Sequence, residues 1–183
     1  MFKKLRKKNY FFIFFIFLLF LLFFTQNIFA SECNEEKVTS LSIYNKHDYE
    51  IHNYICDSED GKYIKNYLSS SNKNNLILLN TIENDGSRDN PEQLAVSIYH
   101  PGGNRKPLLI TLHGQYDCCY PHPEGTTYYI DIFKVSKNGN INKISNILGK
   151  NVSGYDGQND IKEKYFFNFK DIASIKKWLD KHY

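Results

Sequence analysis

Five apolar segments separated by short polar segments dominate the middle of the chain and restrict the fold that it can adopt. The apolar segments cover residues 76–82, 94–100, 108–113, 126–135 and 141–148. The segments between them are rich in turn residues, and the last contains Asn138-Gly139, the strongest short signal for a β-hairpin. Because short turns join antiparallel neighbours, whereas parallel strands need long crossovers, the pattern predicts an antiparallel meander.

Shorter patterns flank this meander. Residues 38–44 and 47–55 alternate between apolar and polar side chains, which predicts two strands, and residues 165–169 predict a last strand after a polar loop at 149–164. Two segments show helical spacing instead. The first is a short one that carries Tyr63, Ile64, Tyr67 and Leu68, and the second follows Asp171 and carries Ile172, Ile175, Trp178 and Leu179.

The predicted fold class is therefore α+β. We expect a single domain with a curved antiparallel sheet, a C-terminal helix packed on its open face and a short helix in the N-terminal part. Asp171 is the expected N-cap of the C-terminal helix, because a carboxylate can accept hydrogen bonds from the free N–H groups of the first turn.

The N-terminus has the three-part order of a secretory signal. A basic segment is followed by an uncharged apolar run over residues 10–24, and small Ala30 stands before Ser31. We predict a signal peptide at residues 1–30, cleavage near Ala30 and a mature domain at residues 31–183 in the periplasm or outside the cell. The alternative is an uncleaved anchor, although the apolar run is shorter than the roughly 20 residues of a membrane-spanning helix.

The charge of the chain follows the same division. Five of its 23 Lys and Arg residues and none of its 20 Asp and Glu residues lie in residues 1–30, so the remainder carries a net charge of −2. The basic character belongs to the targeting segment. We therefore expect no nucleic-acid partner, and membrane contact only through the signal peptide.

All four cysteines lie in the predicted mature domain, at Cys33, Cys56, Cys118 and Cys119. An even number of cysteines in an exported protein favours disulfides over free thiols or a metal site. Adjacent side chains of an extended chain point to opposite sides, so we expect Cys118 and Cys119 to bind separate partners, Cys33 and Cys56. The alternative joins Cys33 to Cys56 and leaves Cys118 and Cys119 joined to each other or free.

The segment from Thr81 to Glu92 places oxygen ligands at alternate positions around Gly86. It resembles the Asp-rich calcium loops of EF-hands and of FG-GAP-type β repeats, with Glu83, Asp85, Asp89 and Glu92 as the ligands that the resemblance implies. Thr81 replaces the first Asp of those loops, and Arg88 brings a cation into the segment. We expect a plain polar turn with no bound metal, and keep calcium as the weaker alternative.

The densest group of reactive side chains lies between His113 and Gly125. Residues 106–114 resemble the strand and His-Gly segment that opens the oxyanion loop of α/β-hydrolases, but the G-x-S-x-G nucleophile motif of that family is missing from the sequence. A cysteine-pinned, proline-stiffened loop with aromatic and acidic side chains suits recognition, because its order lowers the entropy lost on binding. The candidate binding residues are Tyr116, Asp117, Tyr120, His122 and Glu124.

These patterns favour an exported, non-catalytic binding protein with a protein partner and no cofactor. An immunity-type inhibitor of a toxin that acts in the cell envelope fits the size, the signal and the acidic charge. The alternative is a small exported hydrolase or metal-dependent enzyme in which the loop from His113 to Glu124 supplies acid–base groups, such as His113 or His122 with Asp117.

Overall fold

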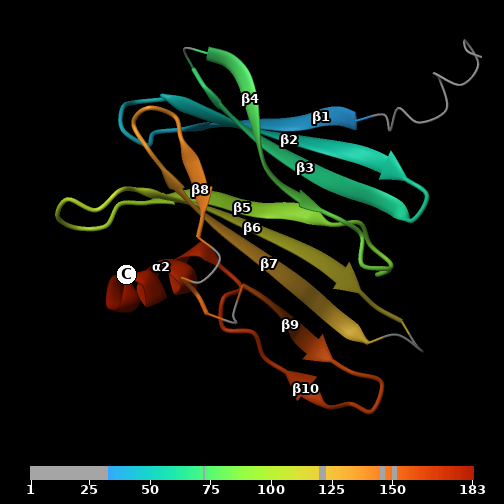
Figure 1. Cartoon of the computed structure of the whole chain (residues 1–183). Helices are drawn as coiled ribbons and strands as arrows, with labels where there is room; N and C mark the ends of the chain where they lie inside the picture. The colour runs from blue at the N-terminus through green and yellow to red at the C-terminus, as the bar shows by residue number, and fades with distance from the viewer. Residues whose placement is uncertain (1–32, 72, 120–122, 145–146, 150–151) are drawn as a thin grey trace, which may run out of the picture. The chain divides into compact units, whose positions relative to one another are not determined.

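The computed structural model of the chain describes residues 33–71, 73–119, 123–144, 147–149 and 152–183, which form one compact unit. The predicted signal peptide lies outside the described residues, as do Tyr120 and His122. The unit contains two antiparallel sheets and one C-terminal helix (Figure 1). The antiparallel α+β class is therefore confirmed, but the single sheet that we predicted is two.

The small sheet is a four-stranded meander in the order β1-β2-β3-β4. Its strands are β1 (Cys33–Leu41), β2 (Tyr49–Ser58), β3 (Gly61–Ser70) and β4 (Lys73–Ile82). The large sheet has the order β10-β9-β7-β6-β5, and β8 also pairs with β7. Its strands are β5 (Glu92–Tyr99), β6 (Leu108–Asp117), β7 (Glu124–Val135), β8 (Ile141–Lys143), β9 (Ser153–Gln158) and β10 (Lys164–Tyr165).

Strand β6 is buried on both faces because the large sheet is the middle layer. Leu108, Ile110 and Leu112 pack in a core shared with the C-terminal helix. Leu109, between them, packs with Phe133 of β7 in a second core shared with the small sheet. This burial on both faces explains why the sequence of β6 is a continuous apolar run. In strands with one solvent-exposed face, apolar and polar residues alternate instead.

The short helix that we predicted over residues 63–68 is wrong. These residues belong to β3, in which Ile64, Asn66 and Leu68 are buried while Tyr63 and Lys65 are more exposed. Over a few residues, the same apolar positions can fit both the spacing of a helix and the alternation of a strand. Pairing with β2 on one side and β4 on the other selected the strand.

The segment from residue 141 to residue 169 also differs from its prediction. Strand β8 ends at Lys143, and the expected loop at 149–164 contains β9, which pairs with the first half of β7. The expected last strand is reduced to the two residues of β10. The hairpin around Asn138 is confirmed: Gly139 donates its backbone N–H to Ser136 with a φ of 87°.

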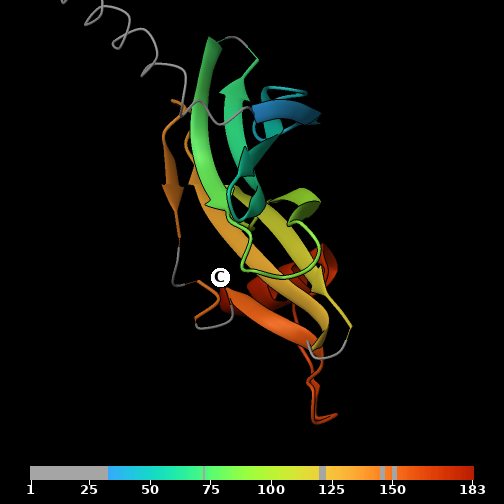
Figure 2. The ribbon, with the colours of Figure 1, turned by 90° about the vertical axis from the view of Figure 1, so that its right-hand side faces the viewer.

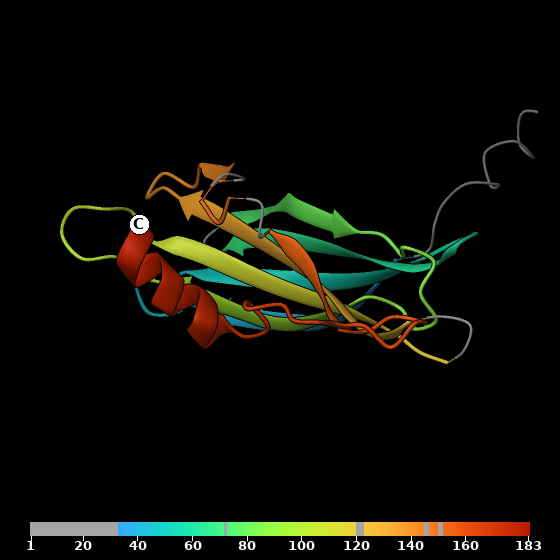
Figure 3. The same ribbon diagram turned by 90° about the horizontal axis from the view of Figure 1, so that it is seen from below.

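The C-terminal helix is α2 (Ile172–His182), and Asp171 is its N-cap, as predicted. The Asp171 carboxylate accepts a hydrogen bond from the Ser174 backbone N–H at 2.7 Å. Ile175 and Leu179 are buried against the large sheet. Figure 3 shows α2 across one end of this sheet, the end at which the β5–β6 loop lies. Among the described residues, no helix is long and apolar enough to cross a membrane.

The cysteines form the disulfides Cys33–Cys56 and Cys118–Cys119. Disulfide bonding is therefore confirmed, but the separate partners that we predicted for Cys118 and Cys119 are wrong. Cys33 and Cys56 are directly opposite each other in the β1–β2 register, with Cα atoms 4.0 Å apart. Our argument about Cys118 and Cys119 assumed an extended chain, but β6 ends at Asp117 and Cys119 has a φ of 77°, so the chain turns there.

Candidate functional site

The candidate binding residues that the structure describes, Tyr116, Asp117 and Glu124, belong to the end of β6 and the start of β7, at the end of the large sheet away from α2, where the β4–β5 loop also lies (Figures 1 and 3). We call this end the tip and define it as residues 84–90, 116–119 and 124. Two backbone contacts join its parts. The Asp89 N–H donates to the Tyr116 carbonyl at 3.2 Å, and the Arg88 N–H donates to the Asp117 carboxylate at 3.1 Å.

Gln115 holds the β4–β5 loop against β6 from below the surface. Its side chain is 1% exposed, and its amide nitrogen donates to Asn84 Oδ1 at 2.7 Å and to the Asp89 carbonyl at 3.0 Å. Its amide oxygen accepts from the Asp85 N–H at 3.4 Å. These hydrogen bonds of a buried amide hold the β4–β5 loop in one position on β6.

Of the five predicted binding residues, the structure brings together Tyr116, Asp117 and Glu124. The Tyr116 hydroxyl donates to the Glu124 carboxylate at 3.4 Å, and the ring is 39% exposed. Asp117 stabilises the tip itself, because one of its carboxylate oxygens accepts hydrogen bonds from the backbone N–H groups of both Arg88 and Cys118. Partial desolvation and the Glu124 carboxylate raise the pKa of Tyr116.

Leu94 of β5 is another exposed apolar residue of the large sheet, with an exposed fraction of 41%. Leu94 lies over Gly114, where an added Cβ would collide with its side chain. A residue larger than glycine at this position would force the Leu94 side chain to shift. The sequence did not suggest Leu94 as part of a site, because an apolar residue in a strand is expected to face the core.

Arg88 is a tip residue to which the sequence assigned no binding role. Its Nη1 atom donates to Sγ of Cys118 at 3.1 Å and to Sγ of Cys119 at 2.7 Å. The guanidinium therefore lies against the disulfide, and the backbone of the same residue is fixed by Asp117. The signal in the sequence was its rarity, since Arg88 is one of three arginines in the chain.

The predicted calcium ligands are arranged as a turn. Asp85 uses both carboxylate oxygens: one accepts from Ser87, and the other accepts from the Tyr129 hydroxyl at 2.9 Å. Burial opposes its charge, but these hydrogen bonds hold the pKa of Asp85 below its ordinary value, while burial and Asp85 raise the pKa of Tyr129. Glu83, Asp89 and Glu92 belong to no metal-binding cluster, since none occurs in the described part of the chain.

The enzymatic alternative required His113 to lie on a loop, but it does not. It lies within β6, is 0% exposed and faces the small sheet, where its Nε2 atom accepts from the Asn66 side-chain amide at 2.8 Å. Burial lowers the pKa of His113 to about 4, although the Asp131 carboxylate acts in the opposite direction. His113 therefore stays neutral at physiological pH and does not reach the surface that carries Tyr116 and Glu124.

A chain of polar side chains crosses the space between the two sheets. Asn53 donates to Asn66 at 3.0 Å, Asn66 donates to Asn80 at 2.8 Å, and Asn80 donates to Asp131 at 2.6 Å. Asn53 Oδ1 and His113 Nδ1 are the buried side-chain atoms that lack a partner among the described residues. Each buried asparagine stands at an inward position of its strand, which was the signal that sequence analysis missed.

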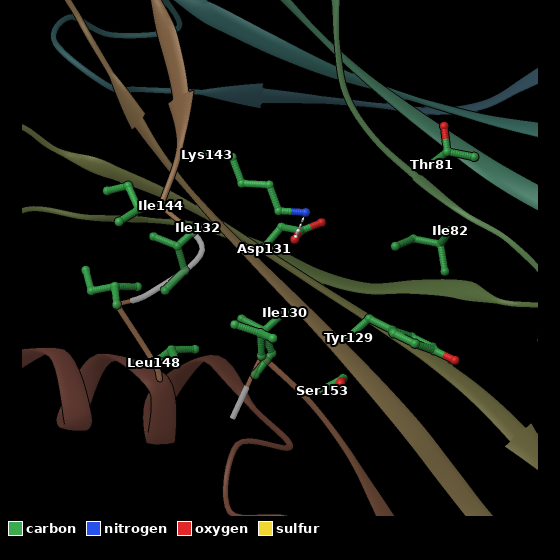
Figure 4. A pocket seen from close by; sticks show the side chains of 12 residues that line it. Thr81, Ile82, Tyr129, Ile130, Asp131, Ile132, Lys143, Ile144, Leu148 and Ser153 are labelled. Carbon is green, nitrogen blue, oxygen red and sulfur yellow. Dashed lines mark ion pairs between the residues drawn. The ribbon is translucent and has the colours of Figure 1, made fainter. Parts of the chain in front are cut away.

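The last residue of this row of polar side chains, Asp131 of β7, lines a cavity of about 300 Å³. Figure 4 shows Asp131 paired with Lys143 in the wall, with apolar side chains such as Ile130 and Leu148 around them and Ile82 of β4 on the opposite side. Strands β4 and β8 lie on the same side of the two sheets (Figure 2). Both carboxylate oxygens of Asp131 are engaged, by Lys143 and Asn80, so the wall offers no free carboxylate from this residue.

A comparison of the chain with protein-family models, with curated proteins and with solved structures finds no match.

Proposed function

We propose that the protein is an exported binding protein that recognises a protein partner through the tip and the adjoining surface of the large sheet. The observation that carries this proposal is the half-exposed pair Tyr116 and Leu94 on a sheet end that α2 does not cover. Aromatic rings on rigid supports are the residues that contribute most to protein–protein affinity.

Preorganisation supports the proposal. The tip is held by the Gln115 amide, by the Asp117 carboxylate and by the Cys118–Cys119 disulfide, so little conformational entropy remains to be lost on binding. The tip contains four acidic residues, Asp85, Asp89, Asp117 and Glu124, and one basic residue, Arg88. Their excess favours a partner with a basic surface, which would approach faster at low ionic strength.

The N-terminal signal pattern and the disulfides suit a protein that works in the periplasm or outside the cell. Within this class we favour an immunity-type inhibitor of a toxin that acts in the cell envelope, since a rigid acidic surface can block a basic active site by occupation alone. Of the two histidines that the enzymatic alternative named, His113 is buried in β6, and His122 lies outside the described residues.

The experiment is site-specific photocrosslinking in cells that naturally produce the protein. A photoreactive amino acid is placed at Tyr116, at Leu94 or, as the matched control, at Tyr54 of the small sheet. We expect one covalent adduct of the same mass from the first two positions and no such adduct from Tyr54. A Glu124→Lys substitution should weaken the adduct by reversing charge at the tip.

Mass spectrometry of the adduct identifies the partner. A toxin-like protein supports the immunity-type role, and another basic protein supports the broader binding role. Adducts of equal yield at Tyr54 and Tyr116, or none at the two tip positions, would overturn the proposal.

A further inference from the structure

The two disulfides differ in access to solvent. Cys56 is 0% exposed and Cys33 is half-buried, and their bridge joins directly opposite residues of the paired strands β1 and β2. Cys119 is exposed and Cys118 is half-buried at the open end of the large sheet. Attack on a disulfide requires that a thiolate reach one sulfur atom in line with the bond, so access favours reaction at Cys119.

The two disulfides also differ in their electrostatic surroundings. One Nη atom of Arg88 donates to both sulfur atoms of Cys118–Cys119, at 3.1 and 2.7 Å. The backbone that carries this side chain is held in place, since the Arg88 N–H donates to the Asp117 carboxylate and the Asp89 N–H donates to the Tyr116 carbonyl. Breaking the disulfide places negative charge on sulfur, and a fixed guanidinium stabilises that charge.

We propose that Cys118–Cys119 is a site of thiol–disulfide exchange with dithiol reductants, and that Arg88 favours its reduced form. This inference does not depend on the proposed partner. It assigns to the tip a covalent chemistry that Cys33–Cys56 does not share.

The exchange has two steps. A thiolate of the dithiol attacks Sγ of Cys119, the Cys118–Cys119 bond breaks, and its electron pair leaves on Sγ of Cys118 beside Arg88. The second thiolate of the reductant then attacks the other sulfur atom of the same reductant molecule, which is bonded to Cys119 in the mixed disulfide. This forms the cyclic disulfide of the reductant and releases Cys119 as a thiolate. The dithiol loses two electrons and becomes a disulfide, the cysteine pair gains them, and the protons of the reductant pass to solvent or to the new thiolates.

The test is a redox titration of the full chain in mixtures of reduced and oxidised dithiothreitol, followed by alkylation and peptide mass spectrometry. We expect Cys118–Cys119 to be half reduced at a ratio of reduced to oxidised reagent at least tenfold lower than Cys33–Cys56 requires. In the Arg88→Met variant, the midpoint of Cys118–Cys119 should require about a tenfold higher ratio, equal to a shift of about 30 mV for two electrons.

Arg105→Met is the matched control, because Arg105 contacts the backbone carbonyls of Gly102 and Tyr183 and no cysteine. It should leave both midpoints unchanged. A parallel titration with glutathione distinguishes dithiol chemistry from monothiol chemistry. With glutathione we expect a mixed disulfide at Cys119 to accumulate instead of the reduced pair Cys118 and Cys119.

Two results would overturn the inference. The first is reduction of both disulfides at one midpoint in the unsubstituted protein, a measurement that does not depend on how the variant folds. The second is an equal effect of Arg88→Met and Arg105→Met on the Cys118–Cys119 midpoint.

Discussion

The buried His113 should make the protein lose stability between pH 7 and pH 5. Its pKa is about 4 in the folded protein and near 6.5 when exposed. Because the unfolded chain takes up a proton that the folded protein excludes, the free energy of unfolding is highest above pH 6.5 and falls as the pH decreases toward 4. Proton linkage with these two pKa values gives a loss of about 2 kcal/mol between pH 7 and pH 5.

Urea unfolding at the two pH values, with both disulfides intact, measures this loss. In the His113→Gln variant the loss should largely disappear, although the variant should be less stable at pH 7 by about 1–3 kcal/mol, because the Asn66 amide nitrogen loses one of its two acceptors and keeps Asn80. His100→Gln removes an exposed histidine and should keep the full loss. If His113→Gln loses as much stability as the unsubstituted protein between pH 7 and pH 5, the titration of His113 is not the cause and the reasoning is wrong.

Two other predictions concern single positions. Gly154→Ala should destabilise the protein by about 1–3 kcal/mol in urea unfolding, because a Cβ there collides with the Phe167 ring, whereas Gly102→Ala, which has open space, should have little effect; equal effects would contradict the packing argument. Millimolar calcium should leave the melting temperature unchanged, because Asp85 already uses both carboxylate oxygens. A rise of several degrees that is lost in Asp85→Ala and Asp89→Ala would instead establish the calcium site.

The polar contacts between the two sheets suggest how the sheets find one relative position. Asn66 of the small sheet is hydrogen-bonded to Asn53 and Asn80 of its own sheet and to Gln93 and His113 of the large sheet, so it joins three strands of the small sheet to two of the large one. A purely apolar interface would tolerate sliding with little change in energy, whereas a displaced amide would leave buried donors and acceptors without partners. Burial between the sheets, which removes His113 from water, lowers the pKa of its imidazole.

Local patterns predicted the parts of this protein that depend on neighbours along the chain. Asp171 starts α2 because capping involves the next three residues, and Asn138-Gly139 turns the chain because only Gly139 has to adopt a positive φ. The meander of β5, β6 and β7 followed from apolar runs with short connections. We predicted Tyr116, Asp117 and Glu124 as neighbours on one loop, whereas the structure places them at the end of β6 and the start of β7, which pair with each other.

The sequence by itself therefore determined the antiparallel strands, the capped C-terminal helix and the disulfide chemistry. Only the tertiary structure decided that the strands divide into two sheets, that residues 63–68 extend and that Cys33 binds Cys56. It also brought Arg88 to the sulfurs of Cys118 and Cys119. The physical reason is range: capping, turns and alternation act over a few residues, whereas sheet division, burial of His113 and the Arg88 contact depend on segments 30 or more residues apart that meet only when the cores close.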